Sequence, residues 1–265
     1  MIRSLAPEVA VVDLTHDIPA HDVRAGALCL ARAAQYLCPG VVLAVVDPGV
    51  GTDRRAIAVE VGEGESLLVG PDNGLLAPAV AMVGGAGRAV SLINPEYQLP
   101  APGPTFAGRD IFAPAAAHLC NGVDLYELGD PVDAASLLPG VLPVTHYDGD
   151  ELVAEVLWVD RYGNAQLNVD PDEVAEWGAR LRLRFGEGLV DGRTLVQAPT
   201  YAALGPGDVG LVVDSYGLLS IAVPRASAAD RLGLAAGDPV RLVRLDDDDS
   251  GAHGVTSSVQ LRPRG

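Results

Sequence analysis

The most distinct hydrophobic pattern in the chain is an unbroken apolar run over residues 41–46, followed at once by Asp47 and a Pro-Gly pair. Four of these six residues are β-branched, so the run predicts a strand that is buried on both faces, as in parallel sheets. Proline and glycine then end the strand, because proline cannot donate to a ladder and glycine accommodates the turn. Asp47 is therefore expected at the carboxyl end of a strand, the edge at which open α/β folds bind ligands.

The first half of the chain alternates between strand patterns and helix patterns. Asp22 is a suitable cap for a helix over 23–37, and a Cys-Pro-Gly sequence ends that helix. A proline-rich loop over 94–106 is long enough to cover an active site. The alternation predicts a three-layer α/β domain with a mostly parallel sheet over residues 1–138. Its other expected elements are strands over 9–14, 56–61, 66–69 and 89–93, a hairpin turn at 62–64, and helices after the 71–74 turn through 82 and over 111–120.

After the prolines at 139 and 143, the chain changes to short strands separated by turns. This spacing is typical of a small antiparallel barrel or sandwich, so we expect a β-barrel-like domain over 150–265, joined to the first domain by a linker over 139–149. The four aspartates at 246–249 and the tail are expected to be solvated and mobile. The strands are predicted over 152–160, 165–169, 181–185, 209–214, 218–223 and 240–245.

The composition narrows the possible functions. The chain has 18 basic and 35 acidic residues, so we expect no basic patch of the kind that binds nucleic acid. Cys29, Cys38 and Cys120 have no metal-like spacing and are expected to be reduced thiols. The first residues lack a signal-peptide pattern, and no apolar segment reaches the ~20 residues of a membrane helix. We therefore expect a cytoplasmic protein that binds neither nucleic acid nor membrane.

The loop after the 41–46 strand combines a carboxylate with a guanidinium. Arg54 follows Asp47 closely enough for the loop to return the arginine to the carboxylate. Two simpler interpretations are that Asp47 caps a turn and that Arg54 and Arg55 are surface charges. The glycines of this loop lack the lysine and the spacing of a P-loop, which disfavours phosphate binding there.

A metal-dependent hydrolase is a competing interpretation of the first half. His118 lies within an alanine-rich helix pattern and is better explained as a packing residue. A serine triad is disfavoured, because the chain has no Gly-x-Ser-x-Gly sequence. The metal site would draw on three histidines and four aspartates whose spacing matches no ligand motif: His16, His21, His118, Asp13, Asp17, Asp47 and Asp72.

Two similar turns stand at strand ends in the second half. The sequence Asp160-Arg-Tyr-Gly-Asn164 offers an aromatic face and an amide, the groups that stack on a purine and bind its edge. Its simpler interpretation is a polar β-turn with a half-buried tyrosine. The sequence Asp214-Ser-Tyr-Gly217 offers a hydroxyl and backbone N–H groups that suit a carboxylate.

Together, these motifs resemble those of the S-adenosyl-L-methionine (SAM) hydroxide adenosyltransferases, adenosine-forming hydrolases related to the fluorinase and the chlorinase. The matching segments occur in the family order and span almost the whole chain. They are VDLTHDIP at 12–19, DVRAGA at 22–27, VVDPGVGTDRR at 45–55, VGPDNGLL at 69–76, TFAGRDIFAP at 105–114, DRYGN at 160–164 and DSYG at 214–217.

The resemblance implies a fold, an assembly and a set of site residues. The fold is an N-terminal α/β domain and a C-terminal β-barrel-like domain. The assembly is a homotrimer whose active sites lie between the N-terminal domain of one subunit and the C-terminal domain of the next. Asp47 and Arg54 match two members of the family's catalytic Asp-Arg-His trio. By resemblance, Asp160 and Ser215 hold the methionine end of the substrate, Tyr162 and Asn164 hold the adenine, and Phe106 and His21 line the pocket near the ribose.

The chain departs from the family pattern in two places. Family members usually read Thr-Phe-His-Gly-Arg-Asp, but Ala107 stands at the histidine position, and His118 on its helix is no substitute. Met1 comes after the strand ending in Thr-Asp-Phe-Gly with which family members start, so we expect the sheet to lack a central member and the pocket one clamp. The halogenases carry an aromatic residue at the position of Asp47 and a hydroxyl at that of Val50, which favours the hydrolase.

The resemblance therefore implies hydrolysis of SAM to adenosine and L-methionine, with no cofactor and no metal. Asp47 orients a water molecule or takes its proton, and Arg54 stabilises the carboxylate and the developing hydroxide. Because a positioning group contributes about 10²–10⁴-fold in rate, Ala107 predicts weak turnover. Two alternatives stay open: a protein that binds adenosyl ligands with little or no turnover, and the metal-dependent hydrolase.

Overall fold

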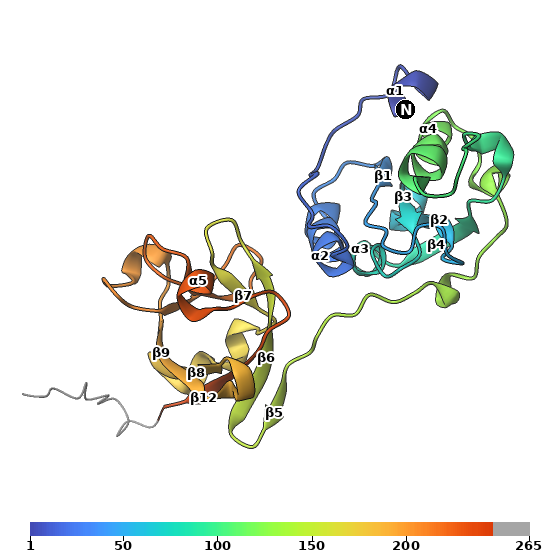
Figure 1. The fold of residues 1–265 in the computed structure, drawn as a ribbon. Helices are drawn as coiled ribbons and strands as arrows, with labels where there is room; N and C mark the ends of the chain where they lie inside the picture. The colour runs from blue at the N-terminus through green and yellow to red at the C-terminus, as the bar shows by residue number, and fades with distance from the viewer. Residues whose placement is uncertain (246–265) are drawn as a thin grey trace, which may run out of the picture. The chain divides into compact units, whose positions relative to one another are not determined.

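The computed structural model describes residues 1–245 and divides the chain into two compact units (Figure 1). The first unit comprises residues 1–142, and the second begins at Pro143, inside the stretch expected to connect two domains. The expectation for the four aspartates at 246–249 and the tail falls outside the described residues. Within residues 1–245, no helix combines the length and the apolar character needed to span a bilayer.

The first unit is built on a mixed sheet with the strand order β1-β3-β2-β4. β1 and β3 are parallel, whereas β2 pairs antiparallel with both β3 and β4. The expectation of a mostly parallel sheet is therefore wrong. The reason is the short turn Gly62–Gly64, since a connection of that length joins neighbouring strands only in antiparallel fashion. The strands are β1 (Val41–Leu43), β2 (Ala56–Val61), β3 (Ser66–Pro71) and β4 (Ala86–Ser91).

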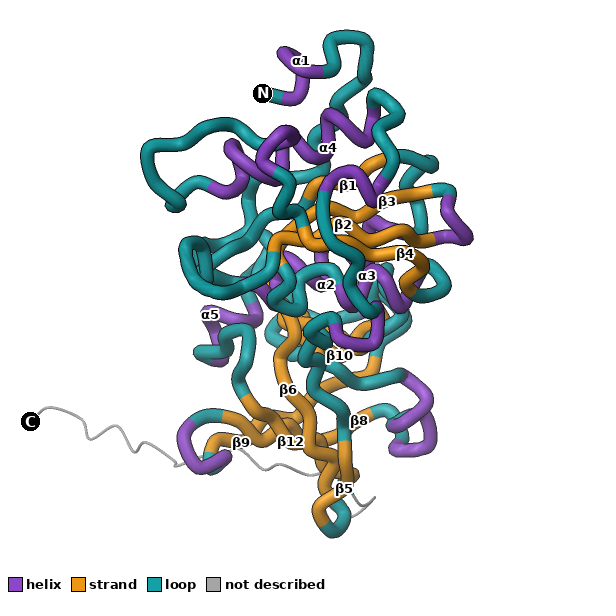
Figure 2. Tube along the Cα trace, turned by 90° about the vertical axis from the view of Figure 1, so that its right-hand side faces the viewer, coloured by secondary structure: helices purple, strands orange, loops and turns teal. Residues whose placement is uncertain are grey.

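Helices cover both faces of this sheet (Figure 1 and Figure 2). Successive residues of a strand point to opposite faces, and β2 divides its residues between two cores in this way. Val59 packs with Leu30 of α2 and Ala79 of α3, while Ala58 packs in the other core with Leu119 of α4. The helices are α1 (Ile2–Leu5), α2 (Val23–Ala34), α3 (Ala77–Met82) and α4 (Ala113–Cys120), the last preceded by a π-helical turn, Gly108–Phe112.

Two strand predictions in the first unit are wrong. Residues 9–14 form no strand, and Val12 is 80% exposed. Among the described residues, β1 is an edge strand that pairs with β3 alone, so the 9–14 segment has no ladder partner to hold it in the sheet. The second error is one of length: the 41–46 run forms a ladder only as β1 (Val41–Leu43), although the N–H of Ala44 still donates to the carbonyl of Val69 over 3.0 Å.

The second unit is a closed β-barrel, one of the two architectures expected. Its strand order is β12-β8-β9-β10-β11-β7-β6-β5, and an additional pairing of β12 with β6 closes the ring. Two of its strands, β5 and β9, were not predicted, because both are rich in polar residues. The elements are β5 (His146–Asp148), β6 (Glu151–Val159), β7 (Ala165–Leu167), β8 (Arg180–Phe185), β9 (Asp191–Gln197), β10 (Gly210–Val213), β11 (Leu219–Ala222), α5 (Ala228–Leu232) and β12 (Pro239–Arg244).

Candidate active site

Asp47 and Arg54 form a shielded ion pair in the loop that follows β1. Nη2 of Arg54 donates to Oδ2 of Asp47 over 2.6 Å. The side chain of Arg54 is 11% exposed and that of Asp47 is 6% exposed. The loop turns back because the N–H of Val50 donates to the carbonyl of Asp47 and the hydroxyl of Thr52 donates to the carbonyl of Gly49. The prediction that this loop returns the arginine to the carboxylate is confirmed.

The ion pair leaves one acceptor and one donor unused. Oδ1 of Asp47 and Nε of Arg54 are buried and have no hydrogen-bond partner within residues 1–245. Nearly all buried polar atoms in native proteins are paired, and an unpaired one costs about 1–3 kcal/mol. An acceptor and a donor that lack partners can bind a water molecule or a ligand that gains access to them. The ring of Phe112, 5.3 Å from Cζ of Arg54, adds a cation–π contact that holds the guanidinium in place.

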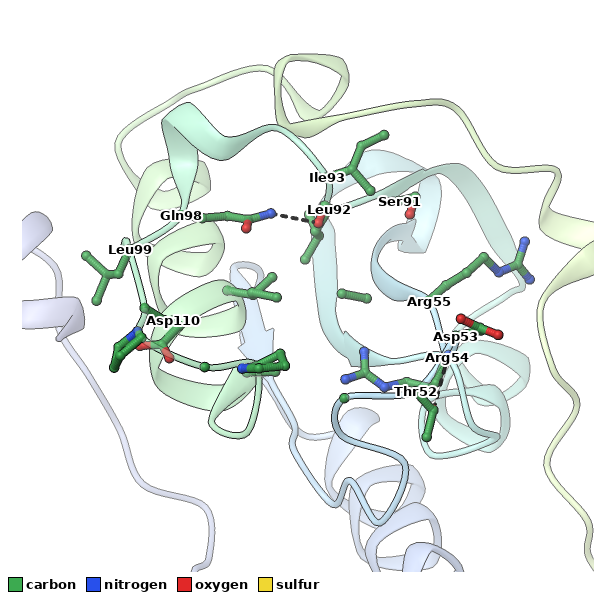
Figure 3. Close-up of a pocket in the computed structure, with 18 residues that line it drawn as sticks. Thr52, Asp53, Arg54, Arg55, Ser91, Leu92, Ile93, Gln98, Leu99 and Asp110 are labelled. Atoms are coloured by element: carbon green, nitrogen blue, oxygen red, sulfur yellow. Dashed lines mark hydrogen bonds between the residues drawn. The ribbon is translucent and has the colours of Figure 1, made fainter.

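Arg54 also lines a cavity of about 700 Å³, a volume within the range of small-molecule sites (Figure 3). The loop over 51–56 lies on one side of the cavity, Gln98 and Asp110 lie across from it (Figure 3), and Ala107 is also among the lining residues. Ala107 is buried at the start of the π-helical turn. The structure therefore places Ala107, which by resemblance stands at the position of a histidine, among the residues that line the same cavity as Arg54.

Asp110, another residue that lines the cavity, forms an ion pair with its neighbour Arg109. It is buried, and its two carboxylate oxygens accept hydrogen bonds from Arg109 over 2.6 and 2.9 Å. These hydrogen bonds lower the pKa of Asp110, and the nearby positive charge adds to the effect. Cζ of Arg109 in turn lies 4.9 Å from the ring centre of Phe106. Phe106 itself is 57% exposed and is not among the residues that line the cavity.

Arg55 extends away from Arg54 and forms a second charged cluster (Figure 3). Its Nε donates to Oδ2 of Asp72 over 2.8 Å, and its Nη2 donates to the carbonyl of Ser136 over 2.6 Å. The other carboxylate oxygen of Asp72 accepts from the N–H of Leu138. Two consecutive arginines therefore have different roles, and the interpretation of both as surface charges is wrong.

The histidines and aspartates of the competing metal-site interpretation do not converge. His16 pairs with Asp13 at the surface, and His118 packs edge-on against the ring of Tyr97 at 5.0 Å. His21 is exposed with a φ of 68°, and it does not line the cavity. Within the described part of the chain, no three His, Cys, Asp or Glu side chains are grouped so that they could hold a metal ion.

The 160–164 turn of the second unit brings three predicted residues together. Oδ1 of Asp160 accepts from the N–H groups of Tyr162 and Asn164, and its Oδ2 accepts from the side-chain amide of Asn164. The carboxylate of Asp160 is thus used within the turn, which leaves the amide oxygen of Asn164 and the ring of Tyr162 for a ligand. Tyr162 is 74% exposed, so the interpretation of a half-buried turn tyrosine is wrong.

The 214–217 turn has the same construction. Oδ1 of Asp214 accepts from the N–H groups of Tyr216 and Leu218, just as Asp160 does in its own turn. Ser215, the residue after Asp214, is exposed. Gln166 of β7 donates to the other carboxylate oxygen of Asp214, which ties the two hairpins together.

Tyr201 is a residue near these turns that sequence reasoning missed. Burial raises the pKa of its phenol, and the charges of Asp160 and Asp214 raise it further. The phenol therefore lies within electrostatic reach of both turns. Tyr201 follows β9, a strand that was itself not predicted, so no sequence signal placed this residue beside the turns.

Comparisons with known proteins agree over both units. Family models for the N-terminal and C-terminal domains of SAM hydroxide adenosyltransferase match residues 1–129 and 154–241. A (R)-S-adenosyl-L-methionine hydrolase of Salinispora tropica is 43% identical over 242 residues, which cover 91% of this chain and 89% of that protein. Another, from Thermus thermophilus, is 42% identical and covers 92% and 91% of the two chains.

More distant similarity extends to a halogenating enzyme and to a solved structure. A fluorinase of Actinopolyspora mzabensis is 26% identical over 273 residues, which cover 92% of this chain and 90% of that protein. The crystal structure of an uncharacterized conserved protein from Thermotoga maritima has a TM-score of 0.80 at 30% identity and covers 92% of each chain.

Proposed function

The chain is an enzyme of the SAM hydroxide adenosyltransferase family, and we propose that it hydrolyses SAM to adenosine and L-methionine at the Asp47–Arg54 pair. The observation that carries this proposal is the shielded ion pair that keeps Oδ1 of Asp47 and Nε of Arg54 without a partner among the described residues. This geometry suits a reaction whose one requirement is a water molecule held in line with the bond that breaks.

The proposed step is a displacement at C5′ of the ribose. The water oxygen forms a bond to C5′ while the bond from C5′ to the sulfonium sulfur breaks, and its electron pair leaves with the sulfur. Methionine therefore departs as a neutral thioether and needs no acid. The proton of the water passes to Asp47, and Arg54 stabilises the negative charge that develops on the oxygen. The reaction consumes one water and releases one proton.

The second unit is proposed to hold the adenosyl and methionyl groups. Tyr162 offers an exposed ring for stacking, and the amide oxygen of Asn164 is available for the adenine edge. Asp160 attracts the substrate's positive groups while it stabilises the turn, and Ser215 is available to the methionine carboxylate. Phe106 and His21 are proposed to approach the ribose. The homotrimer and the cytoplasmic location stay predictions.

Ala107 supports a second candidate function, the binding of adenosyl ligands with little or no turnover. No histidine is found among the described residues that line the cavity, and His118 is held against Tyr97 instead. A site that lacks the family histidine retains the cavity and the ion pair but loses one positioning group, which lowers the rate by about 10²–10⁴-fold.

The decisive experiment is incubation with SAM in water enriched in ¹⁸O, followed by chromatography and mass spectrometry. We expect adenosine that carries the heavy oxygen at its 5′-hydroxyl, together with an equal amount of L-methionine. The Asp47→Asn variant should lower the rate by about 10²–10⁴-fold, because it keeps the shape of the side chain but removes the proton acceptor.

A matched control is Asp150→Asn, the same substitution at an exposed turn of the second unit, which should leave the rate unchanged. Tight binding of SAM in a calorimetric titration without any adenosine would favour the second candidate. Equal activity of the Asp47→Asn variant and the unmodified chain would refute the role given to the ion pair.

A further inference from the structure

The barrel of the second unit carries a concentration of arginine that the proposed function does not use. A cleft of about 400 Å³ is lined by residues of β8 and β9, by the loop before β10, and by Arg231 of α5. All 18 basic residues of the chain are arginine, and the formal charge of the chain is −17. The sequence therefore predicted no basic patch, yet four arginines line this single cleft: Arg180, Arg182, Arg193 and Arg231.

The strand register places Arg180 and Arg182 together, whereas Arg193 lies opposite the buried Leu183 and belongs to the other face of the ladder. Residues at even numbers along β8 point away from the core, so Arg180 and Arg182 lie on the same face. Across the ladder, Arg180 lies opposite Val196 and Arg182 opposite Thr194. Arg231 is then anchored beside them, since its Nη2 donates to the carbonyl of Gly207 over 3.2 Å. Arginines from distant parts of the sequence therefore meet on a rigid sheet.

These charges are not neutralised within the described residues. None of the four arginines has a carboxylate at ion-pair distance among residues 1–245, whereas Arg184, the next outward residue on β8, lies 2.7 Å from Glu151. Asp208 is the one carboxylate among the residues that line the cleft, and it accepts a hydrogen bond from the N–H of Gly205. The cleft therefore keeps an excess of positive charge, and a bound anion relieves the repulsion among its arginines.

We propose that this cleft is a binding site for an anion with two or more phosphate groups, of which pyrophosphate is the simplest. Guanidinium groups bind phosphate oxygens through paired, charge-assisted hydrogen bonds, and the cleft has the volume of a small-molecule site. The hydroxyl of Thr194, which lies opposite Arg182 in the ladder, adds a further donor. None of the described residues that line the cleft is aromatic, so the site has no platform for a nucleobase and recognises the phosphate groups alone.

Calorimetric titration of the full chain with pyrophosphate, in a buffer free of phosphate, tests the proposal. We expect saturable binding of one pyrophosphate per chain, which weakens as the ionic strength rises. Cytidine diphosphate should bind about as tightly as pyrophosphate, because its nucleoside finds no partner in the cleft. The Arg182→Gln and Arg231→Gln variants should each bind pyrophosphate about tenfold or more weakly, the loss expected for one hydrogen bond between charged groups.

Two further variants separate recognition of the phosphate from a general effect of charge. Arg182→Lys keeps the positive charge but loses the planar fork, so it should bind more weakly than the unmodified chain and more tightly than Arg182→Gln. Arg3→Gln removes the same charge from α1 in the first unit and should bind pyrophosphate normally. Tryptophan fluorescence checks that each barrel variant is folded, because Trp158 and Trp177 both lie in the second unit.

Three outcomes would overturn the proposal. The first is the absence of saturable binding at pyrophosphate concentrations up to about 10 mM, because a dissociation constant above that value is too weak for specific recognition. The second is equal affinity for pyrophosphate in the Arg3→Gln variant and in the double variant that combines Arg182→Gln with Arg231→Gln. The third is a change in the molar mass of the assembly, measured by light scattering, in the arginine variants without any binding of pyrophosphate. That last result would show that the cleft contacts another copy of the chain.

Discussion

The pair formed by Arg55 and Asp72 predicts an unequal response to two matched truncations. The carboxylate of Asp72 is 3% exposed beside Arg55, and in the Arg55→Ala variant it keeps one described donor, the N–H of Leu138. Removal of one partner from a buried ion pair costs about 3–5 kcal/mol, because the remaining charge is left uncompensated. In Asp72→Ala, the side chain of Arg55 is 35% exposed and still reaches Ser136, so water and that contact replace the lost partner.

Asp72→Ala should therefore cost less, about 1–3 kcal/mol, chiefly for the unpaired N–H of Leu138. Unfolding in urea, followed by far-ultraviolet circular dichroism, measures both free energies. The double variant should lose less than the sum of the two single losses, since the residues share one interaction. The chain offers an internal control. Both tryptophans lie in the second unit. The urea midpoint measured by tryptophan fluorescence should therefore shift less than the midpoint measured by circular dichroism.

An equal loss in the two single variants would refute the argument from burial. So would strict additivity in the double variant, because it would mean that the two side chains do not stabilise each other. A fluorescence midpoint that moves as far as the dichroism midpoint would show that the two units unfold together. The stability of the first unit would then not be separable from that of the barrel.

Three further predictions follow from single positions. Ala107→His should raise the rate of adenosine release by about 10²–10⁴-fold, and an unchanged rate would refute the role of that position. Hydrogen bonds from Arg109 lower the pKa of Asp110 below its ordinary 3.8, so the charged carboxylate stabilises the fold above that value. This contribution is lost as the pH falls through the lowered pKa. Asp110→Asn should flatten the acid limb of stability, and an equally steep limb would count against the pair. Gly163 has a φ of 81°, and an added Cβ would clash with the side chain of Ser227. Gly163→Ala should therefore destabilise the second unit by about 1–3 kcal/mol, as tryptophan fluorescence would show; a stability equal to that of the unmodified chain would mean that the turn can shift freely.

Local patterns in the sequence predicted the elements whose residues are uniformly apolar or alternate strictly. β2 (Ala56–Val61) lies where it was predicted, because its alternating residues enter two separate cores. The 9–14 segment shows the limit of such patterns. Its apolar residues predicted a buried strand, but a strand also needs a neighbouring backbone, and the local sequence carries no information about that neighbour. β9 shows the opposite case, a strand that its own sequence does not predict. Its residues are largely polar, but β8 and β10 pair with it on both sides and hold it in the barrel.

The candidate site was predictable to the extent that its residues are close in sequence. Asp47 and Arg54 belong to one loop, and the loop's own turns bring them together. The 160–164 turn was likewise predictable, because its aspartate bonds to residues two and four positions further on. Tyr201 was not predictable, since its approach to the two turns depends on the path of the chain after an unpredicted strand.

The arginine cleft extends this argument to charge. Net charge is a sum over the chain, whereas a binding site depends on which charges the strand register places together. Every second residue of β8 points outward, so Arg180, Arg182 and Arg184 share one face. They differ in whether a carboxylate pairs with them. Arg184 is neutralised by Glu151 from β6, while Arg180 and Arg182 have no carboxylate at ion-pair distance among the described residues. A strongly acidic chain can therefore present a strongly basic cleft, and pyrophosphate binding that responds to Arg182 and not to Arg3 would demonstrate it.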